Sequence, residues 1–305
     1  MKAALLPDRG VVKVAGDGAR NFLHGLVTAD ILKLAPGTAR FCALLTPQGK
    51  IIADFIVAQA QPAQSGGSDG GFFLDIPRAL GATLVERLNL YKLRAKILVE
   101  DLSETLGVLA AWDGAGSTKC GLCYADPRLP ALGLRAIMPP HRAAAAAAEL
   151  GATLVDASEY EAHRIALGVP RGGVDFAYGD AFPHETDMDQ LGGVDFTKGC
   201  YVGQEVVSRI EHRGTARTRA VPVRYDGATP EAGAAVMAGD RQLGTIGSAA
   251  GGHGVALLRL DRVDEAIAQG QKLSAGTMPI HLVKPDWARF AFPGEAKKPV
   301  EKAAE

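Results

Sequence analysis

A short segment in the second half of the chain concentrates reactive side chains around two glycines. It reads Lys198-Gly199-Cys200-Tyr201-Val202-Gly203-Gln204-Glu205, and we call it the cysteine motif. The lysine stands two positions before the cysteine, and a nearby cation favours the thiolate form of a thiol. Gly199 and Gly203 allow the backbone to turn, or to approach a ligand, where a side chain would clash. We therefore predict a reactive thiol at Cys200; the alternative is a small buried residue in a tight turn.

The overall composition is that of a soluble globular protein with no general affinity for polyanions. Of the 305 residues, 47% are hydrophobic and 22% are charged, and the formal net charge is −1. This balance argues against a general nucleic-acid or membrane binder, whose surface carries a net positive field. No window approaches the roughly 18 apolar residues that a transmembrane helix needs. The length predicts two or three domains.

The cysteines and the N-terminus predict a reducing compartment. Cys42, Cys120, Cys123 and Cys200 show no disulfide framework. Cys120 and Cys123 have the spacing of a metal-binding pair but lack a second pair, so we favour a structural role for both. Cys42 lies in an apolar run and is expected in the core. Residues 1–10 have the features of neither a secretory signal nor an arginine-rich transit peptide, and the cytosol is the predicted location.

Hydrophobic periodicity and turn signals predict the elements that must position the cysteine motif. Before the motif they indicate strands at 11–14, 40–45, 50–58, 72–76, 96–101, 105–112 and 134–138, and helices at 19–26, 77–90, 139–150 and 158–167. Thr46-Pro47-Gln48-Gly49 is the turn of a hairpin. After the cysteine motif, short strands at 221–225, 242–248, 255–260 and 280–283 predict a small β-barrel or sandwich. A flexible loop at 61–71 and a disordered tail complete the prediction.

Several segments together carry a resemblance to a known family. They are the complete Lys-Gly-Cys-Tyr-x-Gly-Gln-Glu signature, Arg164-Ile165-Ala166-Leu167-Gly168-Val169-Pro170, Phe182-Pro183-His184-Glu185 and residues 209–214. In these segments the chain resembles the YgfZ-type folate-binding-like proteins. Those proteins are relatives of the glycine cleavage aminomethyltransferase (T-protein) and act in iron–sulfur protein maturation and repair. Matching stretches at 22–30, 44–50, 254–261 and 284–287 extend the resemblance over most of the chain.

The resemblance implies an architecture and a ligand. The implied fold is α+β, with two interleaved α/β subdomains of the T-protein-like folate-binding kind over residues 1–215. A C-terminal antiparallel β-barrel over 216–290 and a tail over 291–305 follow. The implied cofactor is tetrahydrofolate, or a one-carbon derivative of it, bound in a central channel. The implied partners are iron–sulfur client or assembly proteins, including enzymes that modify tRNA.

The resemblance also suggests which side chains contact folate. Glu185 stands where T-proteins place the glutamate that meets the pterin, and a carboxylate can accept paired hydrogen bonds from an aminopterin edge. The alternative is an exposed or helix-capping glutamate. The basic run at 209–219 could hold the glutamate tail of folate, because guanidinium groups match carboxylates, or could be a solvated face of a strand or hairpin. The candidate folate contacts are Glu185, Tyr201, Gln204, Glu205, Arg209 and Arg213.

The candidate catalytic residues are Cys200, Lys198 and Asp54. T-proteins carry adjacent aspartates in the strand after a Gly-Gly turn, and one of these carboxylates takes part in catalysis on the folate nitrogen. At the matching place this chain has Ala53 and Asp54, so one acid of the pair is missing. Asp54 could still act as an acid or base if it faces the channel, or it could be a half-buried strand residue paired elsewhere.

Three functions are compatible with these residues. The first is a folate-binding accessory factor that assembles or repairs iron–sulfur enzymes, with Cys200 as its reactive group. The second is an aminomethyl transferase that uses tetrahydrofolate, against which Ala53 argues. The third is a module that docks on tRNA through the basic run, against which the net charge argues. We favour the first.

Overall fold

The computed structural model describes residues 1–60 and 71–295. Nearly all of the flexible loop predicted at 61–71, and residues 296–305 of the predicted tail, lie outside the described residues. Among those described, none of the helices is both long and apolar enough to cross a bilayer.

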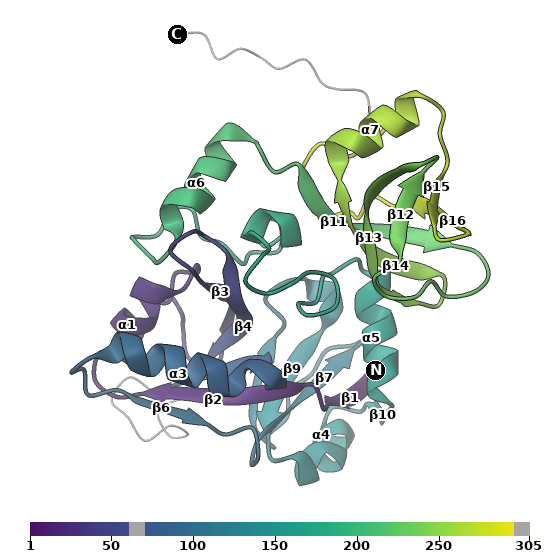
Figure 1. The fold of residues 1–305 in the computed structure, drawn as a ribbon. Coiled ribbons are helices and arrows are strands. Elements are labelled where there is room, and N and C mark those ends of the chain that lie inside the picture. Colours follow the sequence, from purple (N-terminus) through teal and green to yellow (C-terminus); the bar gives the residue numbers. More distant parts are fainter. Residues whose placement is uncertain (61–70, 296–305) are drawn as a thin grey trace.

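Two five-stranded sheets form the centre of the molecule (Figure 1). The first sheet, in spatial order, is β3 (Ala39–Leu45), β4 (Ile51–Gln59), β5 (Phe72–Pro77), β2 (Arg9–Ala15) and β6 (Leu98–Asp101). The second is β10 (Thr153–Leu154), β1 (Lys2–Leu6), β7 (Gly107–Trp112), β9 (Leu134–Met138) and β8 (Leu122–Ala125). The chain begins in the second sheet, builds the first and then returns to the second. The two subdomains are therefore interleaved.

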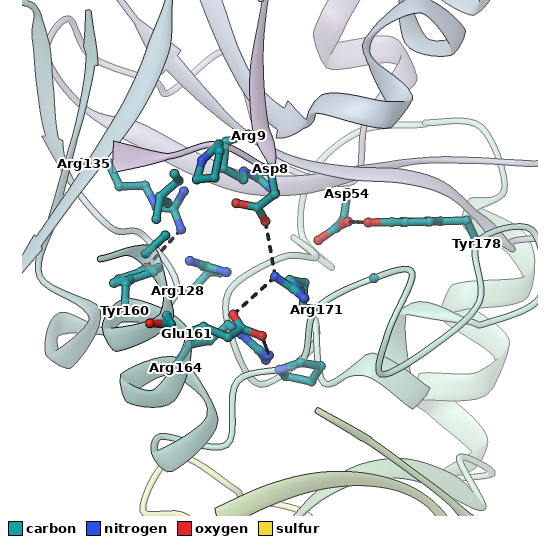
Figure 2. Close-up of a pocket in the computed structure, with 16 residues that line it drawn as sticks. Asp8, Arg9, Asp54, Arg128, Arg135, Tyr160, Glu161, Arg164, Arg171 and Tyr178 are labelled. Atoms are coloured by element: carbon teal, nitrogen blue, oxygen red, sulfur yellow. Dashed lines mark hydrogen bonds and ion pairs between the residues drawn. The ribbon is translucent and has the colours of Figure 1, made fainter. Parts of the chain in front are cut away.

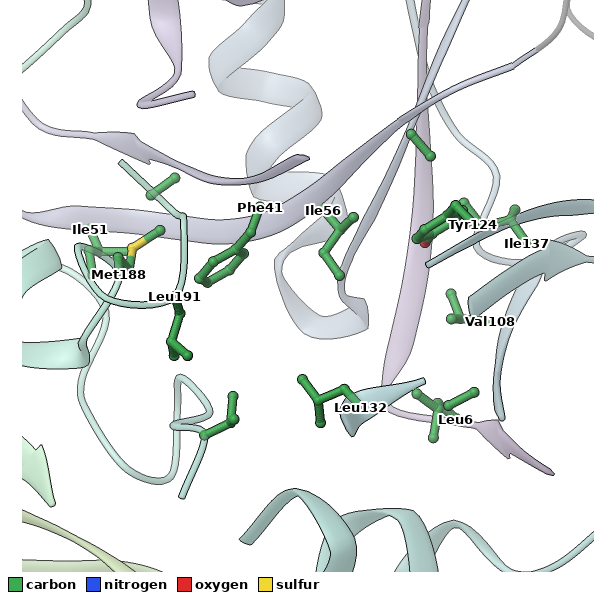
Figure 3. Packing of buried hydrophobic residues seen from close by; sticks show 14 of the residues in the cluster. Leu6, Phe41, Ile51, Ile56, Val108, Tyr124, Leu132, Ile137, Met188 and Leu191 are labelled. Carbon is green, nitrogen blue, oxygen red and sulfur yellow. The ribbon is translucent and has the colours of Figure 1, made fainter. Parts of the chain in front are cut away.

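The sheets stack face to face, with helices on both outer faces (Figure 1). Alternate side chains of a strand point to opposite faces. Val11 therefore joins the cluster between the sheets, whereas Val12 joins the cluster beneath α1 (Ala19–Leu26) and α3 (Gly81–Lys92). The cluster between the sheets contains Phe41 and Ile56 from the first sheet, and Val108 and Tyr124 from the second (Figure 3). α4 (Ala143–Glu149) covers the outer face of the second sheet.

The C-terminal strands close into a barrel, as predicted. Its order is β11 (Thr218–Tyr225), β14 (His253–Arg259), β13 (Arg241–Ala250), β12 (Ala235–Ala238), β15 (Leu273–Ala275) and β16 (Met278–Leu282). β16 pairs with β11 and closes the ring. α7 (Leu260–Ala268) packs on the barrel core, as does the buried Phe292, so ordered packing continues into the first residues of the predicted tail.

The connection between the sheets and the barrel contains the cysteine motif. It runs from α5 (Ala157–Ala166) through the short helix η4 (Pro183–Thr186) to α6 (Gln204–Arg213). The remaining short helices are η1 (Arg78–Leu80), η2 (Pro130–Leu132) and η3 (Pro140–Arg142). For the basic run at 209–219, a strand or hairpin was one alternative. It is wrong for residues 209–213, which belong to α6. Val206, Val207 and Ile210 recur at helical spacing, and Gly214, with φ 57°, ends the helix.

Candidate functional site

The cysteine motif crosses the β3–β4 hairpin turn at two glycines. Gly203, the N-cap residue directly before α6, has φ 82°, and Gly49 of the turn has φ 81°. A Cβ atom on Gly203 would lie 2.6 Å from the Thr46 carbonyl oxygen and 3.1 Å from the Gly49 Cα. A Cβ atom on Gly49 would lie 3.0 Å from the Val206 Cβ. Glycine at both positions therefore allows the motif to lie directly on the hairpin.

Gly203→Ala should destabilise the protein more than Gly214→Ala. Both glycines have positive φ, but a Cβ atom on Gly214 meets nothing within 4 Å. We expect Gly214→Ala to cost about 1–2 kcal/mol for the left-handed backbone. The backbone clash at Gly203 should add about 1–3 kcal/mol. Urea unfolding of the two variants measures the difference, and equal costs would contradict the crossing described here.

Lys198 and Tyr201 anchor the motif in the interior. The Lys198 ammonium donates to the backbone oxygen of Val27 at 2.6 Å and to that of His24, at the C-terminal end of α1. It also lies 4.9 Å from the centre of the Tyr201 ring. Burial lowers the pKa of Lys198 to about 8, although Cys42 and Asp30 oppose this effect. Because a cation is favourable at a helix C-terminus, Lys198 fixes the loop to α1.

Cys200 lies between these two anchors, and its side chain is free and exposed. The alternative of a buried small residue is therefore wrong. Lys198 and Tyr201 are buried, whereas Gly199 and Cys200 between them are exposed, so the residues that hold the loop point inward and the thiol is left accessible. The hydrogen bonds from the Lys198 ammonium to the end of α1 hold the loop in the position that exposes Cys200.

His24 is a neighbour of the thiol loop that the sequence analysis did not single out. A Cβ atom on Gly199 would lie 3.7 Å from the His24 Nε2. The other ring nitrogen, Nδ1, lies 3.3 Å from an Asp30 carboxylate oxygen. Burial, followed by the charge of Lys198, lowers the pKa of His24. The imidazole is therefore neutral near pH 7, and it stands next to the residue that precedes Cys200. His24 lies in the stretch at 22–30 that carries part of the family resemblance, but nothing in the sequence indicates that it lies close to Cys200 in the fold.

The candidate residues on α6 make local contacts. The Gln204 side-chain oxygen accepts a hydrogen bond from the Tyr201 backbone N–H at 3.3 Å, and this bond braces the loop. Glu205 and Arg209 are exposed and pair across one helical turn at 2.6 Å. Arg213 is exposed in the last turn. These three charged residues are absent from the lining of both cavities described next.

Glu185 caps the helix η4. Its carboxylate accepts a hydrogen bond from the Phe182 backbone N–H at 2.8 Å, which is the capping alternative considered for this residue. Burial raises the pKa of Glu185. The side chain also lines a cavity of about 360 Å³ between η4, α6 and the start of the barrel, which we call the η4 cavity. Glu185 therefore both caps η4 and lines this cavity.

Asp54 faces a second cavity, of about 240 Å³, which five arginines line (Figure 2). We call it the arginine cavity. Asp54 accepts a hydrogen bond from the Tyr178 hydroxyl, whose pKa is raised by burial and by Asp54. Ala53 is buried in the cluster on the opposite face of β4. Only one of the two adjacent positions can face this cavity, and Asp54 occupies it. The five arginines are Arg9, Arg128, Arg135, Arg164 and Arg171.

Most of these arginines are held by buried carboxylates behind the cavity wall. Asp126 pairs with Arg128 at 2.7 Å and with Arg135 at 2.8 Å. Arg171 is the most exposed of the five, and its contacts with Asp8 and Glu161 are longer, at 3.3 and 3.4 Å. The arginine cavity thus combines fixed guanidinium groups with one more loosely held. Planar guanidinium groups of this kind suit carboxylates and other oxyanions.

The molecule has the fold of a glycine cleavage aminomethyltransferase. The crystal structure of the glycine cleavage system aminomethyltransferase T from Bartonella henselae matches it with a TM-score of 0.72, over 95% of this chain and 87% of that one. At 14% identity, this likeness shows the fold alone. The family model of the CAF17 C-terminal β-barrel domain matches residues 217–290. The predicted α+β fold with a C-terminal barrel is confirmed.

Curated relatives define the family within this fold. Iron–sulfur cluster assembly factor IBA57 homologues from Mycosarcoma maydis and Pyricularia oryzae are 37% and 32% identical, over 73% and 88% of this chain. The human assembly factor IBA57 is 30% identical over 85% of this chain. The chain spans 57%, 75% and 77% of these three relatives, respectively. It belongs to the IBA57 family of iron–sulfur cluster assembly factors.

The predicted cytosolic location is contradicted by these relatives. All three are named as mitochondrial proteins. The prediction used residues 1–10, but Lys2–Leu6 forms β1, which pairs with β7 in the second sheet. Residues 2–6 therefore reflect the needs of the sheet and carry no signal for a location, and the names of the relatives overturn the prediction.

Proposed function

We propose that the protein supports iron–sulfur cluster assembly through the thiol of Cys200. The observation that carries this proposal is an exposed thiol on a loop held from within by Lys198 and Tyr201. A thiolate can ligate iron or exchange sulfur, and both reactions require access to a partner. The neutral imidazole of His24 beside the loop is a suitable acceptor for the thiol proton. The complete motif also supports kinship with the YgfZ-type proteins.

We also propose that tetrahydrofolate, or a one-carbon derivative of it, binds with its glutamate carboxylates in the arginine cavity. The guanidinium groups there fit carboxylates, and Asp54 offers an acceptor for N–H groups. Pockets for small molecules usually measure about 300–1,000 Å³. The cavity of about 240 Å³ is therefore large enough for only part of a folate. Iron–sulfur clients, including enzymes that modify tRNA, are the partners that the sequence resemblance suggests.

Calorimetric titration with tetrahydrofolate tests the ligand and its place. We expect Arg171→Gln to weaken binding about tenfold, equivalent to ~1.4 kcal/mol, because it removes a cation from the cavity without breaking a buried pair. Arg209→Gln, which removes an exposed guanidinium on α6, is the matched control and should bind like wild type. A loss in Glu185→Gln alone would move the site to the η4 cavity. No binding by the wild type would remove the folate proposal.

A one-carbon transferase is the second candidate, favoured by the position of Asp54. The missing acid at Ala53 argued against transfer, yet that side chain lies on the other face of β4. Asp54 is placed to meet a ligand in the arginine cavity, next to the Tyr178 hydroxyl. Transfer from an aminomethyl donor to tetrahydrofolate that Asp54→Asn abolishes would support this candidate. The absence of any transfer would exclude it.

A further inference from the structure

The end of α3 and the turn after it present large apolar side chains to solvent. Leu90 and Tyr91, in the last turn of α3, are 62% and 36% exposed, and Leu93, directly after the helix, is 85% exposed. In Figure 1 this turn lies at the outer edge of the molecule, on the side away from the barrel. Single exposed leucines are common, but three such side chains within four residues form a patch. We call residues 87–96 the α3 tip.

Leu93 occupies a corner of a tight turn. The Ala95 backbone N–H donates to the Lys92 carbonyl oxygen at 2.8 Å, which places Leu93 and Arg94 at the two central positions. Leu93 has φ 46° and ψ −109°, a conformation that glycine adopts readily and leucine rarely does. Because its side chain is also left in solvent, neither the backbone nor the core accounts for a leucine here. Strained residues of this kind gather at functional sites.

The α3 tip is strongly basic in a nearly neutral protein. Its cations are Arg87, Lys92, Arg94 and Lys96. The first acid before the tip is Glu86 and the first after it is Glu100. Among the residues that the structure describes, none of the four cations forms an ion pair, and the Lys92 ammonium donates to the backbone oxygen of Ile97 at 3.3 Å. Because the whole chain has a net charge of −1, this positive field is local.

An anionic lipid surface is the partner that suits this combination of side chains. Where apolar and basic residues alternate at a protruding turn, the apolar groups enter the headgroup region while the cations stay at the phosphates. Tyrosine is enriched at this depth, and clusters of four or more cations attract anionic lipids. A protein partner, by contrast, usually contacts about 20–30 residues on each side. The α3 tip offers three apolar side chains on a convex corner, which a fluid lipid surface can surround.

We propose that the α3 tip docks the protein on an anionic phospholipid bilayer. Leu90, Tyr91 and Leu93 enter the headgroup region, and the four cations bind lipid phosphates. A contact of this size is weak and reversible, unlike an inserted helix. The net charge of the chain argues against a membrane affinity of the whole surface, with which a local contact is compatible. The tip is absent from the linings of the arginine and η4 cavities, so the inference depends on neither folate nor Cys200.

Sedimentation of the full chain with lipid vesicles tests the docking. The probe is phosphatidylcholine vesicles with one third phosphatidylglycerol, and vesicles of phosphatidylcholine alone are the neutral reference. We expect binding to the anionic vesicles that weakens as salt is added, because ions screen the attraction. Leu93→Ala should weaken this binding about tenfold, since it removes the most exposed apolar side chain of the tip. Leu154→Ala, which shortens an exposed leucine of β10, is the matched control and should bind like wild type.

A second pair of variants tests the charge. Arg94→Gln removes a cation from the corner of the turn and should weaken binding about fivefold. Arg224→Gln removes an exposed cation from the barrel strand β11 and should bind like wild type. Neither arginine forms an ion pair among the described residues, so circular dichroism should show an unchanged fold in both variants.

Three results would overturn the proposal. The first is that wild type fails to bind the anionic vesicles, or binds the neutral vesicles equally well. The second is that Leu93→Ala binds like wild type, or that Leu154→Ala loses as much, because the apolar contact would then not lie at the tip. The third is binding to polyglutamate without binding to vesicles, which would assign the α3 tip to an acidic protein partner instead.

Discussion

Serine in place of Cys200 is expected to abolish rescue of iron–sulfur enzyme activity in cells that lack the protein, without loss of the fold. The thiol is exposed and makes no packing contribution to the buried clusters. Surface substitutions of this kind usually change the free energy of unfolding by at most about 0.5 kcal/mol. A hydroxyl cannot replace a thiolate in iron ligation or sulfur exchange, because its proton is not lost near neutral pH. Enzyme activity in complemented cells and urea unfolding measure the two quantities.

Cys123→Ser is the matched control for this substitution. Cys123 is a partly buried thiol of β8, and burial raises its pKa, so it is a poor source of thiolate. This variant should rescue activity like wild type. Full rescue by Cys200→Ser would remove Cys200 as the reactive group. Failure of both variants would point to the amount of folded protein rather than to thiol chemistry.

Asp75→Ala is expected to cause the largest loss of stability. Asp75 lies in β5 of the first sheet and is fully buried. Its carboxylate accepts hydrogen bonds from Arg9 and Arg135, both at 2.6 Å, and from the Tyr124 hydroxyl at 3.3 Å. Arg135 and Tyr124 belong to the second sheet, so this carboxylate joins the two sheets behind the arginine cavity. Removing one partner of a buried ion pair typically costs about 3–5 kcal/mol.

The exposed pair of Arg78 and Glu104 provides the control. Glu104→Ala breaks an ion pair of similar length, 2.6 Å, at the surface, and should cost at most about 1 kcal/mol. Urea unfolding at pH 7 compares the two variants. A loss below 1 kcal/mol in Asp75→Ala would mean that the two guanidinium groups find water once the carboxylate is gone, contrary to the buried network described here.

The contribution of Asp75 should depend on pH in a defined direction. Burial alone would raise the pKa of this carboxyl, but Arg9 and Arg135 lower it below its ordinary value. The unfolded chain therefore binds a proton at a higher pH than the folded protein does. The stabilisation is complete above the unfolded pKa, about 4, and is lost as the pH falls through the lower folded value. Unfolding free energies at pH 3–7 should accordingly fall less steeply for Asp75→Ala than for wild type.

Local patterns in the sequence predicted much of the fold. The helix at 19–26 and the hairpin around Thr46 to Gly49 match the structure closely, because apolar periodicity and turn residues act over a few positions. Short or irregular elements such as β1 and β8 escaped prediction. β1 is a five-residue strand whose identity depends on pairing with β7, more than 100 residues later. No local pattern records such a partner.

The features of the candidate site also fall into those that the sequence predicted and those that only the tertiary structure decided. Residue types alone pointed to Cys200 as the candidate reactive group, which the structure exposes, and to glycine at Gly203, since a thiol and a positive φ are properties of single residues. The capping of α1 by Lys198, the approach of His24 and the gathering of arginines from β2, β9 and α5 could come only from the tertiary structure. The stacking of the two sheets sets these distances. That stacking is driven by the burial of apolar faces along the whole chain, so the sequence separation of remote polar residues does not reveal how close they lie in the fold.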